Sequence, residues 1–203
     1  MIKKGEMSIT AIVLIAIGAV LLLTIMWGSG SYNGFVRLDK ETDNKWANVQ
    51  SAYQRRADLI PNLVETVKGA RDFEKSTQVE IAELRSQAGK AQIDVKNAQD
   101  AETLQAAGSQ MNSVLSRLLV IVENYPDLKS NQNFLALQDE IAGTENRIKF
   151  ERDNYNKAVK DYQVGVKTFP GMFIARLTGF SQDKHKMFQA DVGAQTAPKV
   201  TFG

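Results

Sequence analysis

The stretch Gln54–Val67, QRRADLIPNLVETV, decides how the helices of this chain are counted. Its apolar residues continue a stripe that begins at Trp46 and advances in alternating steps of three and four, which is typical of a helix face that packs on a partner helix. Pro61 stands in the middle of this stripe. Inside a helix a proline removes a hydrogen bond and clashes one turn back, at a cost of about 3 kcal/mol or more, whereas in the first turn of a new helix it costs little.

The sequence allows two interpretations of Pro61. Asp58 is a competent N-cap residue, so a corner near Ala57–Asp58 would separate a helix over about 34–57 from a second helix over about 59–90. The alternative is one long kinked helix, which the unbroken apolar stripe favours. We prefer the corner.

Two further apolar stripes predict two further helices. One begins near Leu104 and ends at Pro126, and the other follows the N-cap candidates Ser130 and Asn131 and continues to Pro170. At about 38 residues, the last helix would reach roughly 57 Å. No single stripe can bury itself, so we predict an all-α fold with an antiparallel, up-and-down four-helix bundle, or with three helices as the alternative.

The N-terminal part of the chain has the character of a membrane span. No charged residue occurs from Met7 to Val36, and Ile9–Trp27, ITAIVLIAIGAVLLLTIMW, would cover roughly 28 Å as a helix, close to the thickness of a bilayer core. The run is longer than a typical signal-peptide core and no small-x-small cleavage site stands out after it. We therefore predict a retained transmembrane helix that contacts the lipid bilayer through residues 8–27, with GSGS at 28–31 as a flexible exit.

The orientation of this span is not decided by its flanking charges. The positive-inside rule counts Lys3 and Lys4 on one side against Arg37, Lys40 and Lys45 on the other, which is nearly a tie. The compact N-terminal pair slightly favours a cytoplasmic N-terminus. The resulting domain prediction is a tail and transmembrane helix over 1–32, a helical bundle over 33–168, and a C-terminal tail over 169–203 with a short apolar helix and an extended end.

The composition excludes many kinds of chemistry. With 25 basic and 23 acidic residues the net charge is +2, too even for a nucleic-acid binder. The absence of cysteine excludes disulfides and thiolate sites, and the single histidine, His185, lies in a polar tail segment where we expect it to be solvated. One histidine cannot supply an HExxH site or a paired di-iron site. We expect neither an enzyme nor a metal or cofactor.

Polar residues occupy places where the helical stripes predict apolar ones. Thr144 and Glu151 fall on the seam of the last long helix. In one interpretation opposed charges of the bundle satisfy one another and fix its register, with the 145–147 segment pairing across to the arginines near Pro61. In the other, the arginines bind an anionic peptide or lipid head group. The candidate structural or partner-binding residues are Arg55, Arg56, Asp58, Pro61, Asn62, Glu145, Asn146, Arg147 and Arg152.

Six ordered blocks of this sequence resemble one protein family. They are YNGFVRL (32–38), RRADLIPNLVETVKG (55–69), YPDLKSNQNFLALQDE (125–140), TENRIKFERDNYNKAV (144–159), FPGMFIARLTGF (169–180) and APKVTF (197–202). Together they resemble the LemA family of bacterial membrane proteins. Ala70 departs from the family pattern, which commonly has an aromatic residue there, and this implies slightly looser packing.

The resemblance implies a single N-terminal transmembrane helix, a four-helix bundle and a place in the bacterial inner (cytoplasmic) membrane. It implies no established enzymatic activity and no cofactor. One relative is associated with forming the magnetosome membrane, and the topology proposed for the family has the N-terminus outside, so orientation stays open.

The sequence supports two hypotheses for the function. The first is a membrane-anchored scaffold or adaptor that organises or recruits other membrane proteins, including by self-association. The alternative is a ligand-binding or sensory module.

Overall fold

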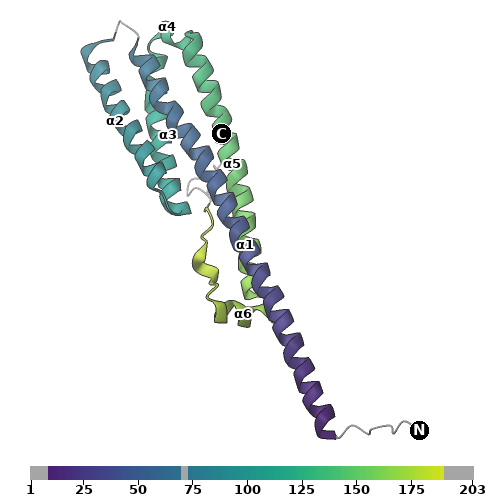
Figure 1. The fold of residues 1–203 in the computed structure, drawn as a ribbon. Helices are drawn as coiled ribbons and strands as arrows, with labels where there is room; N and C mark the ends of the chain where they lie inside the picture. The colour runs from purple at the N-terminus through teal and green to yellow at the C-terminus, as the bar shows by residue number, and fades with distance from the viewer. Residues whose placement is uncertain (1–8, 70–72, 190–203) are drawn as a thin grey trace, which may run out of the picture. The chain divides into compact units, whose positions relative to one another are not determined.

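The computed structural model describes residues 9–69 and 73–189, and these are almost entirely helical, with no strand among them (Figure 1). The predicted all-α class is therefore confirmed. The elements are α1 (Ile9–Lys68), α2 (Lys75–Asn97), α3 (Ala101–Glu123), α4 (Pro126–Lys129), α5 (Gln132–Lys167), α6 (Gly171–Thr178) and the 3-10 turn η1 (Gln182–Lys184).

Helix α1 is one uninterrupted helix of 60 residues with Pro61 inside it. The predicted corner at Ala57–Asp58 is wrong, and so is the predicted second helix over 59–90, because its first part belongs to α1 and α2 begins only at Lys75. The apolar side chains on both sides of Pro61 explain the outcome. Tyr53 and Ile60, on the two sides of the predicted corner, are 4% and 1% exposed, and only a helix that continues in phase keeps both on the core face. Burial of each such side chain contributes about 1.5–3 kcal/mol, which together outweighs the cost of the proline.

The predicted flexible exit at 28–31 is also wrong, because α1 passes through these residues without a break. The hydroxyl of Ser29 donates to the carbonyl of Ile25 at 2.9 Å, one turn back, as serines in helices commonly do. Each glycine costs about 1 kcal/mol in a helix interior, but helix on both sides spares this segment the cost of nucleation. The preceding part of α1 is long and apolar enough to cross a membrane, and its side chains are not buried by the rest of the protein.

The chain forms two compact units, and both α1 and α5 contribute a segment to each. The larger unit contains 42–159 and the described residues from His185 onward, and it is the predicted four-helix bundle of α1, α2, α3 and α5. Figure 1 shows these helices side by side, with successive long helices running in opposite directions. Its core contains fully buried residues from every one of these helices, such as Leu63, Leu84, Leu118 and Val159.

Side-chain caps fix where two bundle helices begin. The Asp100 carboxylate accepts a hydrogen bond from the backbone N–H of Thr103 at 2.8 Å, which lowers the pKa of Asp100 and starts α3. Asn131 accepts from the N–H groups of Asn133 and Phe134 at the start of α5, as predicted.

The smaller unit contains the described residues up to Glu41 together with 160–184. Its buried cluster consists of Phe35, Tyr162, Val166 and Ala175. Gly179, with φ 81°, ends α6 in the left-handed region that glycine tolerates, and Phe180 follows it. The predicted short helix in this part of the tail is confirmed as α6, whereas Ala70 and the predicted extended end at 197–203 lie outside the described residues.

Candidate functional site

The two arginines that precede Pro61 each meet a glutamate of α5. Arg55 pairs with Glu140, and Arg56 pairs with Glu145. The two pairs differ in burial, because the Arg56 side chain is 8% exposed and that of Arg55 is 62% exposed. The Nε of Arg56 is buried and has no hydrogen-bond partner among the described residues. An anionic ligand would compete with Glu145 for the buried Arg56 and with Glu140 for the exposed Arg55.

The other candidate residues have more local roles. Asp58 accepts hydrogen bonds at 2.7 Å from Gln54 in its own helix and from Gln92 of α2, so it ties α1 to α2 instead of capping a helix. Arg147 pairs with Glu151 at 2.8 Å along α5 and does not join the arginines of α1. Pro61 is half-buried, and Asn62 and Asn146 are exposed. The structure thus brings one residue of the 145–147 segment, Glu145, onto the arginine pair.

The segment after η1 folds back onto the bundle, which the sequence did not predict. Phe188 is only 6% exposed. Its ring lies between those of Trp46, Tyr53 and Tyr155, with centroid distances of 6.0, 6.5 and 5.6 Å. The sequence signal for this contact was the apolar pair Met187 and Phe188 directly after the polar run QDKHK.

Two side chains of α5 hold the backbone of this segment. The amide of Asn156 donates to the carbonyl of Phe188 at 3.1 Å and accepts from its N–H at 2.8 Å. The guanidinium of Arg152 lies 4.8 Å from the ring centroid of Phe188 and donates to the carbonyl of Gln189 at 2.9 Å. Arg152 thus holds the segment around Phe188 and takes no part in the ion pairs of Arg55 and Arg56.

The phenol of Tyr155, beside Phe188, is uncharged at neutral pH. Burial, and then the charges of Asp43 and Asp100, raise the pKa of Tyr155 to about 12. The ring therefore stays neutral and acts as a packing surface. Burial and the charge of Asp39 likewise raise the pKa of Tyr162 in the smaller unit.

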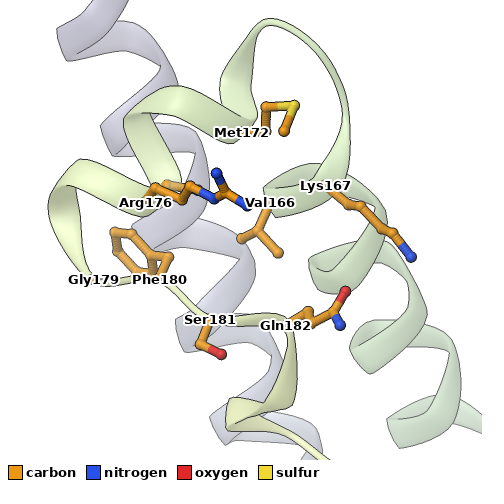
Figure 2. A pocket seen from close by; sticks show the side chains of 9 residues that line it. Val166, Lys167, Met172, Arg176, Gly179, Phe180, Ser181 and Gln182 are labelled. Carbon is orange, nitrogen blue, oxygen red and sulfur yellow. The ribbon is translucent and has the colours of Figure 1, made fainter.

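A cleft of about 500 Å³ opens between the end of α5 and α6, within the smaller unit. Figure 2 shows Arg176 extending from α6 toward Val166, with Lys167 at the opposite rim and Met172 above. Both cations are exposed, and neither forms an ion pair with any residue in the described ranges. The cleft therefore combines an apolar lining with unneutralised positive charge.

These features define a class of protein: a helical bundle on a long N-terminal helix that is apolar enough to cross a membrane, with its internal charges matched against one another. The model of the LemA family matches residues 45–202, so the chain belongs to the LemA family. The named relatives below carry no enzyme name.

The similarity to individual relatives is moderate. The chain is 24% identical over 176 residues to magnetosome protein MamQ 1 of Paramagnetospirillum magneticum, covering 76% of this chain and 64% of that protein. It is 26% identical over 171 residues to MamQ of Magnetospirillum gryphiswaldense, covering 74% and 62%. To protein LemA of Metamycoplasma hominis it is 29% identical over 140 residues, covering 69% and 61%. The chain thus spans somewhat less than two thirds of the length of these relatives.

Proposed function

We propose that this protein is a non-enzymatic, membrane-anchored scaffold that organises or recruits other membrane proteins. The observation that carries the proposal is the continuity of α1, in which a single helix of 60 residues contains both the apolar segment and the first helix of the bundle. A bilayer anchor and an interaction domain are thereby built from the same element. The naming of three relatives as magnetosome proteins supports a role at a membrane.

The interior of the bundle supports this proposal over a catalytic one. Two of its buried polar groups are engaged by neighbours: the buried carboxylate of Glu151 accepts from Arg147, and the hydroxyl of Thr144 donates to the carbonyl of Ile141 at 2.6 Å. Groups neutralised in this way stabilise a register and are not free to act on a substrate. The proposed location is the bacterial inner (cytoplasmic) membrane, and the proposed partners are membrane proteins, including further copies of this chain.

Photo-crosslinking in intact membranes tests the scaffold. Phe150 is an apolar residue of α5 that is 60% exposed, and Lys157 is an exposed polar residue on the same helix. A photo-reactive amino acid is placed at one position or the other in the full chain, and adducts are weighed after purification. We expect a discrete adduct that forms much more strongly from position 150. A chain that remains monomeric from both positions, with no co-purifying protein, would overturn the proposal.

A further inference from the structure

Helix α6 packs on α1 immediately after the apolar segment. A Cβ atom on Gly28 would lie 3.7 Å from the side chain of Ile174, so the two helices are in contact one residue beyond Trp27. Phe180, just past the end of α6, lies 5.8 Å from the rings of both Tyr32 and Phe35. If residues 9–27 occupy the hydrocarbon core of a bilayer, then α6 lies at the level of the head groups.

The outer face of α6 is apolar and uncovered. Ala175 faces the interior of the smaller unit, whereas Phe173 and Leu177 are 59% and 84% exposed. Phe169 extends this face, because it is 74% exposed and its ring lies 6.1 Å from that of Phe173. Contiguous exposed aromatic and aliphatic side chains mark a surface that a partner or a membrane covers.

The charge of this segment is complementary to a lipid surface. No acidic residue occurs from Tyr162 to Gln182, and the only charged residues there are Lys167 and Arg176. Both line the cleft of Figure 2. An apolar face flanked by cations is the pattern of helices that lie in the membrane interface, and anionic phospholipids attract such cations.

We propose that α6 is an interfacial helix that inserts Phe169, Phe173 and Leu177 into the bilayer that α1 crosses, and that Lys167 and Arg176 hold the phosphate of an anionic phospholipid in the adjoining cleft. The bilayer is the occupant because α6 contacts α1 at Gly28, one residue after the apolar segment, and its exposed face is apolar. The inference rests on the proposed function in one respect, namely that residues 9–27 span the membrane. It adds a second point of membrane contact and a lipid preference.

Spin labelling of the full chain in vesicles tests the insertion, because the chain has no cysteine and single labels need no background mutations. Leu177→Cys reports on α6, Leu22→Cys on the apolar segment, and Val120→Cys on an exposed apolar site of the bundle that is 61% exposed. The vesicles contain phosphatidylcholine and phosphatidylglycerol. We expect the ratio of oxygen to aqueous nickel-complex accessibility at position 177 to resemble that at position 22 and to exceed that at position 120 several-fold.

The outcomes separate the inference from the proposed anchor. A water-accessible label at 177 with a lipid-exposed label at 22 would overturn the inference and leave the anchor intact. A water-accessible label at 22 would overturn the anchor itself. A label at 177 that neither reagent reaches would show a protein partner or a second copy on this face, and would likewise overturn the lipid assignment.

A second arm tests the lipid preference. Vesicles of phosphatidylcholine alone are expected to lower the accessibility ratio at position 177 relative to vesicles with phosphatidylglycerol. Lys167→Gln combined with Arg176→Gln is expected to remove this dependence on phosphatidylglycerol. The matched control replaces two exposed lysines of the bundle, Lys90 and Lys157, in the same way, and it is expected to keep the dependence. A double variant at 167 and 176 that responds to phosphatidylglycerol like the parent would show that these cations do not hold the lipid.

Discussion

The two adjacent arginines of α1 provide an internal comparison of one chemical interaction at two levels of burial. Both pair with glutamates of α5, and the partners Glu140 and Glu145 are similarly accessible at 42% and 56% exposed. Only the arginine environment differs strongly, with Arg56 at 8% and Arg55 at 62% exposed. A difference between the two pairs in free energy of unfolding therefore reports on burial of the guanidinium.

The expected magnitudes follow from that difference. Glu145→Ala leaves a buried guanidinium without its carboxylate, and we expect a loss of about 3 kcal/mol, near the lower end for breaking a buried pair because Glu145 itself is half in water. Arg56→Met keeps most of the apolar packing and leaves Glu145 solvated, so we expect a loss below about 1 kcal/mol. In the Arg56→Met background, Glu145→Ala should cost about 0 kcal/mol, which gives a coupling energy of about 3 kcal/mol.

The matched cycle uses Arg55→Met and Glu140→Ala. Water screens this pair, so each variant and the coupling energy should stay below about 1 kcal/mol. Equilibrium urea unfolding of the full chain in detergent, followed by circular dichroism, measures the parent and the six variants. Added salt should weaken the coupling of the exposed pair more than that of the buried pair. Equal coupling energies in the two cycles, or a neutral Glu145→Ala, would refute the reasoning.

Three further predictions concern stability. Pro61→Ala should stabilise the chain by about 1–3 kcal/mol, since it restores a helix hydrogen bond; a loss of stability in thermal unfolding would show that α1 needs the proline's shape. Gly108→Ala should destabilise the bundle by about 1–3 kcal/mol, because the new Cβ would lie 2.6 Å from the ring of Tyr53. The control Gly143→Ala has open space around its Cβ and should stabilise α5 by up to about 1 kcal/mol. Between pH 10 and 12 the unfolded state releases the Tyr155 proton more readily than the native state does, so Tyr155 should lower the free energy of unfolding by up to about 2.7 kcal/mol as the pH rises through this range. Tyr155→Phe should make the pH dependence of unfolding shallower, and the part that arises from Tyr162, whose pKa is also raised, should remain.

The sequence predicted those features that depend on local pattern. The uncharged run of α1, the stripe of α3 and the Asn131 cap of α5 are readable from residue type and spacing, and all three are present. The family resemblance rested on longer blocks and is likewise confirmed. Predicting these features does not require knowing which helices pack against one another.

The break predicted before Pro61 failed because its outcome depends on tertiary packing. The penalty of a proline in a helix is a local quantity, visible in the sequence. The compensating burial is not, since it requires α2, α3 and α5 to be in place around Leu63 and Val67, which are fully buried. The same limit applies to the docking of the segment around Phe188, because Phe188 contacts Asn156 across 32 positions of the chain. Two adjacent apolar residues after a polar run are equally compatible with a solvated end.

Of the partners of the arginines, Glu145 lies in the 145–147 segment that the sequence already suggested, although it is 89 positions from Arg56, whereas Glu140 as the partner of Arg55 was not predicted. Once found, they explain what a buried charge adds to this bundle. A slide of α5 by one turn, about 5.4 Å, would bring Ile141 or Lys149 opposite Arg56, leaving the guanidinium beside an apolar side chain or a like charge. An apolar seam with three- and four-residue steps loses little stability when one helix slips by a turn, because apolar side chains again face apolar side chains. Leaving the buried guanidinium without its carboxylate costs more free energy than such a slip does. The buried ion pair therefore selects one register of α1 against α5, and the coupling energy of the Arg56–Glu145 cycle measures the strength of that selection.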